Sequence, residues 1–191
     1  MGSPLVVVVS GAPGSGKSTL AGRLATALAL PVLMKDELKE ALYEAISPEY
    51  ISDVPYNALL GQTAYALLYV VARRLIVANV GVILESNFYR GYSERELTPV
   101  LAGTRSVQVH CGGDAAVIVS RYRERFERGE RHAGHDDMAA IPRLRDALAT
   151  GRCEPLDLPL PTLRVDTTLS SDVTSYAPSF DDILAFIAIH A

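Results

Sequence analysis

The chain has 191 residues, of which 49% are hydrophobic and 21% charged, and its formal net charge is −4. This length suits one domain over residues 1–191, and every apolar run is far shorter than the roughly 18 residues of a membrane span. The acidic balance argues against a long nucleic-acid surface but leaves room for an oligonucleotide end in a basic cleft. The N-terminus lacks a signal-peptide pattern and the two cysteines are far apart, so we expect free thiols and a cytoplasmic protein.

Strand-like and helix-like segments alternate along the chain. Apolar residues or alternating valines predict strands over residues 5–10, 31–34, 82–87, 105–111 and 163–166. Helical spacing of apolar residues predicts helices over residues 17–30, 36–45, 54–79, 93–101, 114–128, 138–149 and 179–189. Prolines and polar residues predict loops over residues 47–55 and 153–161. The alternation predicts an α/β fold: a five-stranded parallel sheet covered by helices on both faces, with ligands at the carboxyl ends of the strands.

The segment after the first predicted strand has the spacing G-x-x-x-x-G-K-[ST], the phosphate-binding loop or Walker A motif. Its residues are Gly11, Ala12, Pro13, Gly14, Ser15, Gly16, Lys17, Ser18 and Thr19. The glycines let the backbone turn so that successive N–H groups surround an anion at the N-terminus of the next helix. Lys17 can reach the β- and γ-phosphates of ATP, and the Ser18 hydroxyl can bind Mg²⁺. The alternative is a glycine turn beside a surface lysine, but a strand before the loop and a helix after it favour a P-loop NTPase fold.

Two acidic residues follow predicted strands, Asp36 after the second and Glu85 in the third. In a parallel sheet both carboxyl groups face the edge that holds the phosphate loop. Asp36 is expected to accept a proton from an attacking hydroxyl, and Glu85 to lie on the metal side. The alternatives are a helix N-cap for Asp36 and an outward-facing acid for Glu85. Asn87 either hydrogen-bonds a substrate or caps a turn.

An arginine-rich segment follows the fourth predicted strand. It holds five arginines within eleven residues: Arg121, Arg123, Arg125, Arg128 and Arg131. Three of them, Arg121, Arg125 and Arg128, share one face of a helix, and planar guanidinium groups suit the charge that develops on a transferring phosphoryl group. Glycines near its end suit a hinge, so we predict a lid over roughly residues 121–137 that excludes water. The alternative is a solvated helix face with ion pairs.

Two further sets of residues have a predicted place. His132 and His135 have no metal-ligand spacing, so we expect them to pack or to hydrogen-bond at the base of the lid. Tyr43 and Tyr56 adjoin the long helix of residues 54–79, which we expect to shape a pocket for the phosphate acceptor.

Taken in order, these motifs resemble the small P-loop kinases, an AAA-type group that includes polynucleotide 5′-hydroxyl kinases, chloramphenicol phosphotransferase, gluconate kinase and zeta toxins. The resemblance covers nearly the whole chain. It rests on residues 11–19, Lys35-Asp36-x-x-Lys39, Glu85-Ser86-Asn87, the arginine-rich segment and Val165-Asp166-Thr167-Thr168.

On the acceptor side, the resemblance implies that Asp36 is the base that activates a hydroxyl group. Lys39 stands where the family often has a substrate-contacting arginine, which puts a bidentate contact in doubt. Glu85 and Asn87 stand at the ends of the family's Asp-x-Asn, with a longer acid here. The resemblance therefore places Asp36, Lys39, Glu85 and Asn87 at the substrate.

On the nucleotide side, the resemblance implies that Arg121 and Arg125 are the catalytic arginines of the lid. Further nucleotide contacts are implied for Arg128, Arg131, Asp166 and Thr167. The last two belong to a stretch that lies near the adenine base in such kinases, and the alternative for it is a strand end with a polar turn.

The function predicted is an ATP- and Mg²⁺-dependent phosphotransferase whose acceptor is a hydroxyl-bearing small molecule. A nucleoside monophosphate or polynucleotide 5′-hydroxyl kinase ranks second, because a phosphorylated acceptor needs more basic residues. Outside the loop and lid the candidates are Lys35, Lys39, Arg73, Arg74 and Arg90. A third class is an ATPase switch that binds a protein partner; a GTPase would need Asn-Lys-x-Asp, which the sequence lacks.

Overall fold

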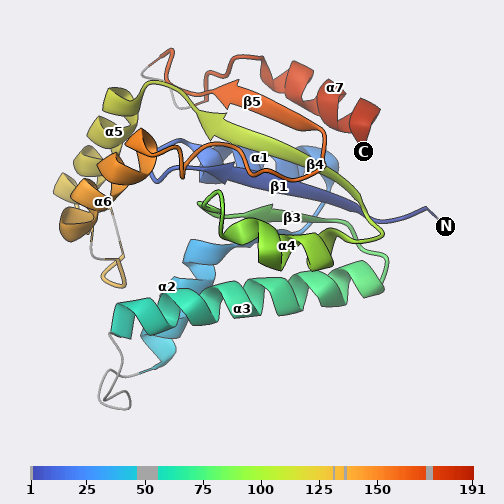
Figure 1. Ribbon diagram of the computed structural model, residues 1–191, viewed down its shortest axis with the longest axis horizontal. Coiled ribbons are helices and arrows are strands. Elements are labelled where there is room, and N and C mark those ends of the chain that lie inside the picture. Colours follow the sequence, from blue (N-terminus) through green and yellow to red (C-terminus); the bar gives the residue numbers. More distant parts are fainter. Residues whose placement is uncertain (1, 47–55, 131, 136, 171–173) are drawn as a thin grey trace.

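A five-stranded parallel sheet forms the centre of the computed structural model, which describes residues 2–46, 56–130, 132–135, 137–170 and 174–191 (Figure 1). Its strand order is β2-β3-β1-β4-β5. The strands are β1 (Leu5–Gly11), β2 (Val32–Met34), β3 (Val82–Glu85), β4 (Arg105–Gly112) and β5 (Thr162–Asp166). The predicted α/β fold is confirmed, and β1 is central because its four consecutive valines are fully buried between two neighbouring strands and two helical layers.

Alternate residues of β1 face different helices. Val6 and Val8 pack in a cluster with α3 (Tyr56–Val77) and α4 (Ser93–Leu101). Val7 and Val9 pack with α1 (Lys17–Leu28) and α7 (Phe180–His190) on the opposite face. A strand with period-two side chains that is apolar at every position is therefore covered on both faces, as the sequence predicts.

Three more helices lie beyond the carboxyl ends of the strands, toward which the arrows in Figure 1 point. They are α2 (Lys35–Ala45), α5 (Ala115–Glu127) and α6 (Asp137–Ala149). Ile118 and Tyr122 of α5 are buried against Ile141 and Leu144 of α6 in a cluster of their own. This pair of helices is therefore anchored beside the sheet edge where the phosphate loop emerges.

The strand register aligns the chain segments that carry the predicted site. Val9 pairs with Glu85, and Glu85 pairs with Met34, the residue before α2 begins. On the other side Gly11 pairs with Cys111. The start of the phosphate loop, the end of β3 and the first turn of α2 consequently lie along one edge of the sheet.

Some element ends differ from the predicted ones. Helix α1 stops at Leu28, two residues early, because Ala29 adopts a left-handed conformation with φ of 51°. The predicted loop over residues 47–55 lies outside the described residues. Both cysteines are free and buried. In the described part of the chain, every helix is too short or too polar to cross a membrane.

Candidate active site

The turn between β1 and α1 has the backbone that a phosphate-binding loop requires. Gly14 and Gly16 have φ of 86° and 75°, a left-handed conformation that side chains disfavour. A Cβ atom on Gly14 would lie 2.6 Å from the carbonyl oxygen of Ile118, so the close approach of α5 also requires glycine there. Gly16 caps α1 without a side-chain hydrogen bond, which leaves the first N–H groups of the helix available to an anion.

A buried ion pair joins the loop to β3. Lys17 Nζ lies 3.5 Å from Glu85 Oε1, and the two side chains are 8% and 3% exposed. Burial raises the pKa of Glu85, and the ammonium group of Lys17 opposes that rise. Glu85 therefore faces the loop and is not an outward-facing acid at a strand end.

An oxygen-rich cavity of about 170 Å³ lies beside this ion pair. Ser18, Glu85 and Asp36 all line it. Ser18 also interacts with the Glu85 carboxylate. One hydroxyl and two carboxylates form a donor set that fits Mg²⁺, which usually takes one or two protein carboxylates and fills its other positions with phosphate oxygens and water. Among the residues that the structure describes, no three or more Asp, Glu, His or Cys side chains are clustered closely enough to hold a metal ion.

Asp36 occupies the first turn of α2 as a helical residue, since the N-cap is Met34 and no side chain caps the helix. Its carboxylate accepts a hydrogen bond from Lys35 Nζ at 3.1 Å. Burial would raise the pKa of Asp36, but the positive charges of Lys35 and Lys17 outweigh it and hold that pKa well below the ordinary value. Asp36 is therefore an ionised carboxylate beside the phosphate loop, and the N-cap alternative does not describe it.

The predicted lid arginines occupy different positions. A cavity of about 500 Å³ beside the loop is lined by Arg121, Arg125 and Arg128 as well as by Gly14, Gly16, Lys17, Ser18 and Thr19. Arg121 donates hydrogen bonds to the carbonyl oxygens of Thr167 (2.8 Å) and Ser170 (2.7 Å). Arg128 is largely exposed and lies 3.5 Å from Glu124 and 3.8 Å from Glu130, so it also forms the ion pairs of the alternative reading. Arg131 lies outside the described residues.

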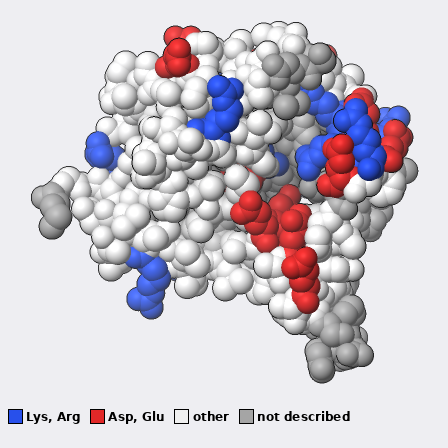
Figure 2. All heavy atoms as spheres, turned by 180° about the vertical axis from the view of Figure 1, so that it is seen from behind, with Lys and Arg blue, Asp and Glu red and all other residues white. Residues whose placement is uncertain are grey.

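Figure 2 shows charged side chains on both sides of this hollow. Arg and Glu side chains gather over α5, and a row of acidic side chains runs over α2. Arg125 lines both the 500 Å³ cavity and the 170 Å³ cavity, and so faces Asp36 and Glu85 as well as the loop.

The end of β5 is fastened to the phosphate loop. The Thr167 hydroxyl donates to the carbonyl oxygen of Ser15 at 2.8 Å, and Thr167 is fully buried. The Asp166 carboxylate accepts hydrogen bonds from the backbone N–H and the hydroxyl of Thr168, both at 2.7 Å. These contacts position the loop, and a role of Asp166 and Thr167 at a nucleotide base stays a prediction.

A second large pocket, of about 570 Å³, opens on the other side of Asp36. Lys39 and Asn87 line it, as does Tyr56, which the sequence associates with an acceptor pocket. Lys39 is buried and donates to the carbonyl oxygen of Gly134 at 2.7 Å, so it also joins α2 to the segment before α6.

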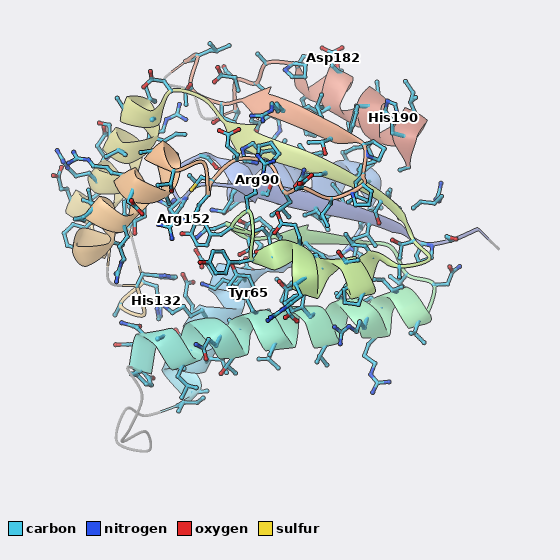
Figure 3. All side chains as sticks on the ribbon, in the orientation of Figure 1. Tyr65, Arg90, His132, Arg152, Asp182 and His190 are labelled. Carbon is cyan, nitrogen blue, oxygen red and sulfur yellow. The ribbon has the colours of Figure 1, made fainter. Side chains whose placement is uncertain are left out.

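The two histidines of the predicted lid base contact α2. His135 Nε2 lies 2.9 Å from Glu40 Oε1, and His132 Nε2 lies 3.4 Å from Glu44 Oε1. The ring of His132 also meets the ring of Tyr43 edge-on, with centroids 5.4 Å apart. In Figure 3 His132 lies below α6, near the start of α3.

Several residues of the 570 Å³ pocket were not named one by one in the sequence analysis. They are Tyr89, Tyr122, Ala140 and Arg143, together with Asn57 and Ala58 at the start of α3. Asn57 and Ala58 lie in the helix expected to shape the acceptor pocket, and Tyr122 lies in the predicted lid segment. Apart from Tyr122, which lies in the arginine-rich segment, none belongs to a motif. A helix-face analysis of α6 could have marked Arg143 as one of its exposed charges, but not as a residue of this pocket.

The chain is similar to proteins of a known family. The model of a family described as an AAA domain matches residues 6–149. A candidate kinase from Chloroflexus aurantiacus has a similar structure, with 30% identity, a TM-score of 0.82 and 99% of each chain covered. Among curated proteins, none matches the sequence.

Two more distant structures share the fold. A gluconokinase from Sinorhizobium meliloti is 20% identical, with a TM-score of 0.57 over 99% of this chain and 94% of that one. Kti12 from Chaetomium thermophilum, solved in complex with ADP-AlF3, is 22% identical, with a TM-score of 0.59 over 95% and 98%. The chain belongs to the AAA-domain family, and its predicted membership of the small P-loop kinases is confirmed.

Proposed function

We propose that the protein transfers the γ-phosphoryl group of ATP to a hydroxyl group of a small molecule. One observation carries the proposal: Asp36 lines both the 170 Å³ cavity beside Lys17 and Ser18 and the 570 Å³ pocket beyond it. A carboxylate at this junction can contact an acceptor on one side and the reacting phosphate on the other. The kinase neighbours support phosphotransfer in general, and the hydroxyl acceptor is inferred from the position of Asp36.

The phosphate loop is proposed to bind the triphosphate. Its N–H groups and the N-terminus of α1 favour anions, and Lys17 exchanges the Glu85 carboxylate for the β- and γ-phosphates. Ser18 and Glu85 would hold Mg²⁺. When bound, this ion neutralises charge that develops on the phosphate oxygens.

In the transfer step, the acceptor oxygen bonds to the γ-phosphorus while the bond from that phosphorus to the oxygen bridging it to the β-phosphate breaks. Asp36 receives the proton of the acceptor hydroxyl, and ADP leaves with the bond electrons. Two cations, Lys35 and Lys17, depress the pKa of Asp36. Once phosphates take up the charge of Lys17, that pKa rises and Asp36 becomes a better base.

The α5 arginines are proposed to complete the site. Arg125 faces both cavities, which supports a role for its guanidinium group in stabilising the transferring phosphoryl group. Arg121, with Arg128 at the rim, would bind the nucleotide from the side of Thr167 and Asp166. Closure of this segment would exclude water as a competing acceptor.

The deciding experiment is ADP release with ATP and Mg²⁺ across sugars, nucleosides, aminoglycoside and phenicol antibiotics, nucleoside monophosphates and 5′-hydroxyl oligonucleotides. Stimulation by one acceptor class, with phosphorylated product detected by mass spectrometry, would establish the kinase and its acceptor. Slow ADP release that no acceptor changes would instead favour an ATPase switch.

A further inference from the structure

An arginine of α6 lines the acceptor pocket and has no acidic partner among the side chains that the structure describes. Arg143 contributes to the wall of the 570 Å³ pocket and forms no hydrogen bond or ion pair with the residues that the structure describes. Nearby arginines are placed differently. Arg152 pairs with Asp146, and Arg145 lines a separate cavity between α5 and α6. A guanidinium group at a pocket wall that pairs with none of the described carboxylates can bind an anion from solution.

The remaining charges of the pocket do not neutralise Arg143. Asp36 is the one carboxylate among the pocket-lining residues that the structure describes, and Lys35 neutralises it from 3.1 Å. Lys39 of α2 adds another ammonium group to the lining of the pocket. His135, a further liner, meets Glu40 at 2.9 Å. Asn57 and Asn87 are uncharged polar liners and suit hydroxyl groups. The pocket thus combines neutral polar groups near Asp36 with a cation on α6.

We propose that the acceptor of this enzyme carries an anionic group, a carboxylate or a phosphate monoester, which Arg143 binds while the reacting hydroxyl lies at Asp36. This rests on the proposed function and narrows its substrate class. Either oxyanion can accept two parallel N–H donors from one guanidinium, so the contact orients the acceptor as well as attracting it. From the sequence we placed phosphorylated acceptors second, because few basic residues were available to bind a phosphate. Arg143 is a further basic residue that was not among those candidates.

The test uses three probes with the same six-carbon chain: D-glucitol, D-gluconate and D-glucitol 6-phosphate. Their affinities are measured by calorimetry on the full chain with ADP and Mg²⁺ present. We expect at least one anionic probe to bind roughly 10-fold more tightly than glucitol. The tighter of the two anions tells whether a carboxylate or a phosphate is preferred.

The variant Arg143→Met should remove the preference for anions and leave glucitol binding unchanged. Arg145→Met is the matched control, because it removes the same charge from the same helix but faces another cavity; it should retain the preference. Thermal unfolding of both variants checks that they fold. Equal binding of all three probes, binding of none, or an anion preference that survives Arg143→Met would overturn the proposal.

The experiments distinguish a failure of the anion site from a failure of the proposed kinase activity. If anions bind through Arg143 but no hydroxyl compound stimulates ADP release, the anion site stands and the kinase fails. If neutral acceptors are phosphorylated as well as anionic ones, the kinase stands and the anion site fails.

Discussion

At the scale of single residues, the buried pair of Lys17 and Glu85 organises the site. Each charge is taken out of water, so each depends on the other for stabilisation. The pair keeps Lys17 at the loop before a phosphate arrives, and it places a carboxylate where a metal ion would bind. The motif identifies Lys17, but its ion-pair partner, Glu85, lies on the neighbouring strand β3.

Replacing Lys17 by Met should weaken ATP binding at least about 100-fold, because several charge-assisted contacts to phosphate disappear. Calorimetric titration with a non-hydrolysable ATP analogue measures this, and normal affinity would rule out the phosphate-loop assignment.

The stability of the native protein should depend on pH through Glu85, and Lys17→Met should make that dependence steeper because the charge that opposes the rise in the Glu85 pKa is lost. Burial raises the pKa of Glu85 above its ordinary value of 4.5, so the folded state retains a proton that the unfolded state has lost. The free energy of unfolding should therefore fall as pH rises above 4.5. Urea titrations at several pH values measure it, and Lys17→Met combined with Glu85→Gln should remove this dependence.

The variant Asp36→Asn should bind ATP nearly as well as the native protein but transfer phosphate about 10²–10⁴-fold more slowly, since an amide cannot accept the hydroxyl proton. Single-turnover kinetics with a productive acceptor separate binding from transfer. Transfer at the native rate would mean that Asp36 is only an acidic residue in the first turn of α2.

At the scale of elements, α5 presents its arginines to two different surroundings. Arg125 faces the nucleotide-side cavities, whereas Arg123 lines the cavity between α5 and α6. One face of α5 therefore lines the site and another face lies beside α6. For this reason the run of arginines does not indicate a single role for all of its members.

This difference gives a matched pair of variants. Arg125→Met should slow transfer by roughly 10²–10³-fold, because a donor aimed at the developing phosphoryl charge is lost. Arg123→Met, which removes the same charge from the same helix, should stay close to the native rate. Steady-state kinetics of both variants decide the point; equal effects would show that only the net charge of α5 matters.

The contact between β1 and β4 includes a buried histidine. His110 Nδ1 lies 3.0 Å from Ser10 Oγ, and burial lowers the pKa of His110 from 6.5 to about 4. Between these values the unfolded state binds the proton and the folded state does not. Stability should therefore fall as pH drops from 6.5 toward 4, by up to about 3 kcal/mol at about 1.4 kcal/mol per pKa unit. Denaturant titrations across this range measure the loss, and His110→Gln should lack this component.

At the scale of the whole molecule, the acceptor pocket is closed by contacts between segments far apart in the chain. Lys39 of α2 donates a hydrogen bond to the carbonyl oxygen of Gly134, and the Glu40 carboxylate lies within hydrogen-bond distance of the His135 ring. These contacts span 95 residues of sequence. They join α2 to the segment before α6, and both contribute residues to the lining of the pocket.

Lys39→Met should loosen this closure and let water compete with the acceptor, raising ATP hydrolysis relative to transfer several-fold. Measuring ADP and phosphorylated product together gives the ratio, and Arg73→Met, an exposed charge on α3, is the control. A higher KM for the acceptor at an unchanged ratio would instead make Lys39 a substrate contact, as the resemblance to the small P-loop kinases implies.

By itself the sequence determined the five strands, the helices on both faces and the phosphate loop. Those features are local, since they follow from the period of apolar side chains and from glycine and lysine at fixed spacing within one turn. The position of Asp36 and Glu85 at one edge also followed, because parallel strands end on the same side.

Only the tertiary structure decided which groups meet. The carbonyl oxygens that bind Arg121, the carboxylate that pairs with Lys17, and the place of Arg143 in the acceptor pocket depend on segments distant in the chain. Such contacts leave no local pattern, because the partner is chosen by strand order and helix packing and not by neighbouring residues. The phosphate loop could therefore be predicted from the sequence, whereas the residues that line the acceptor pocket could be identified only from the tertiary structure.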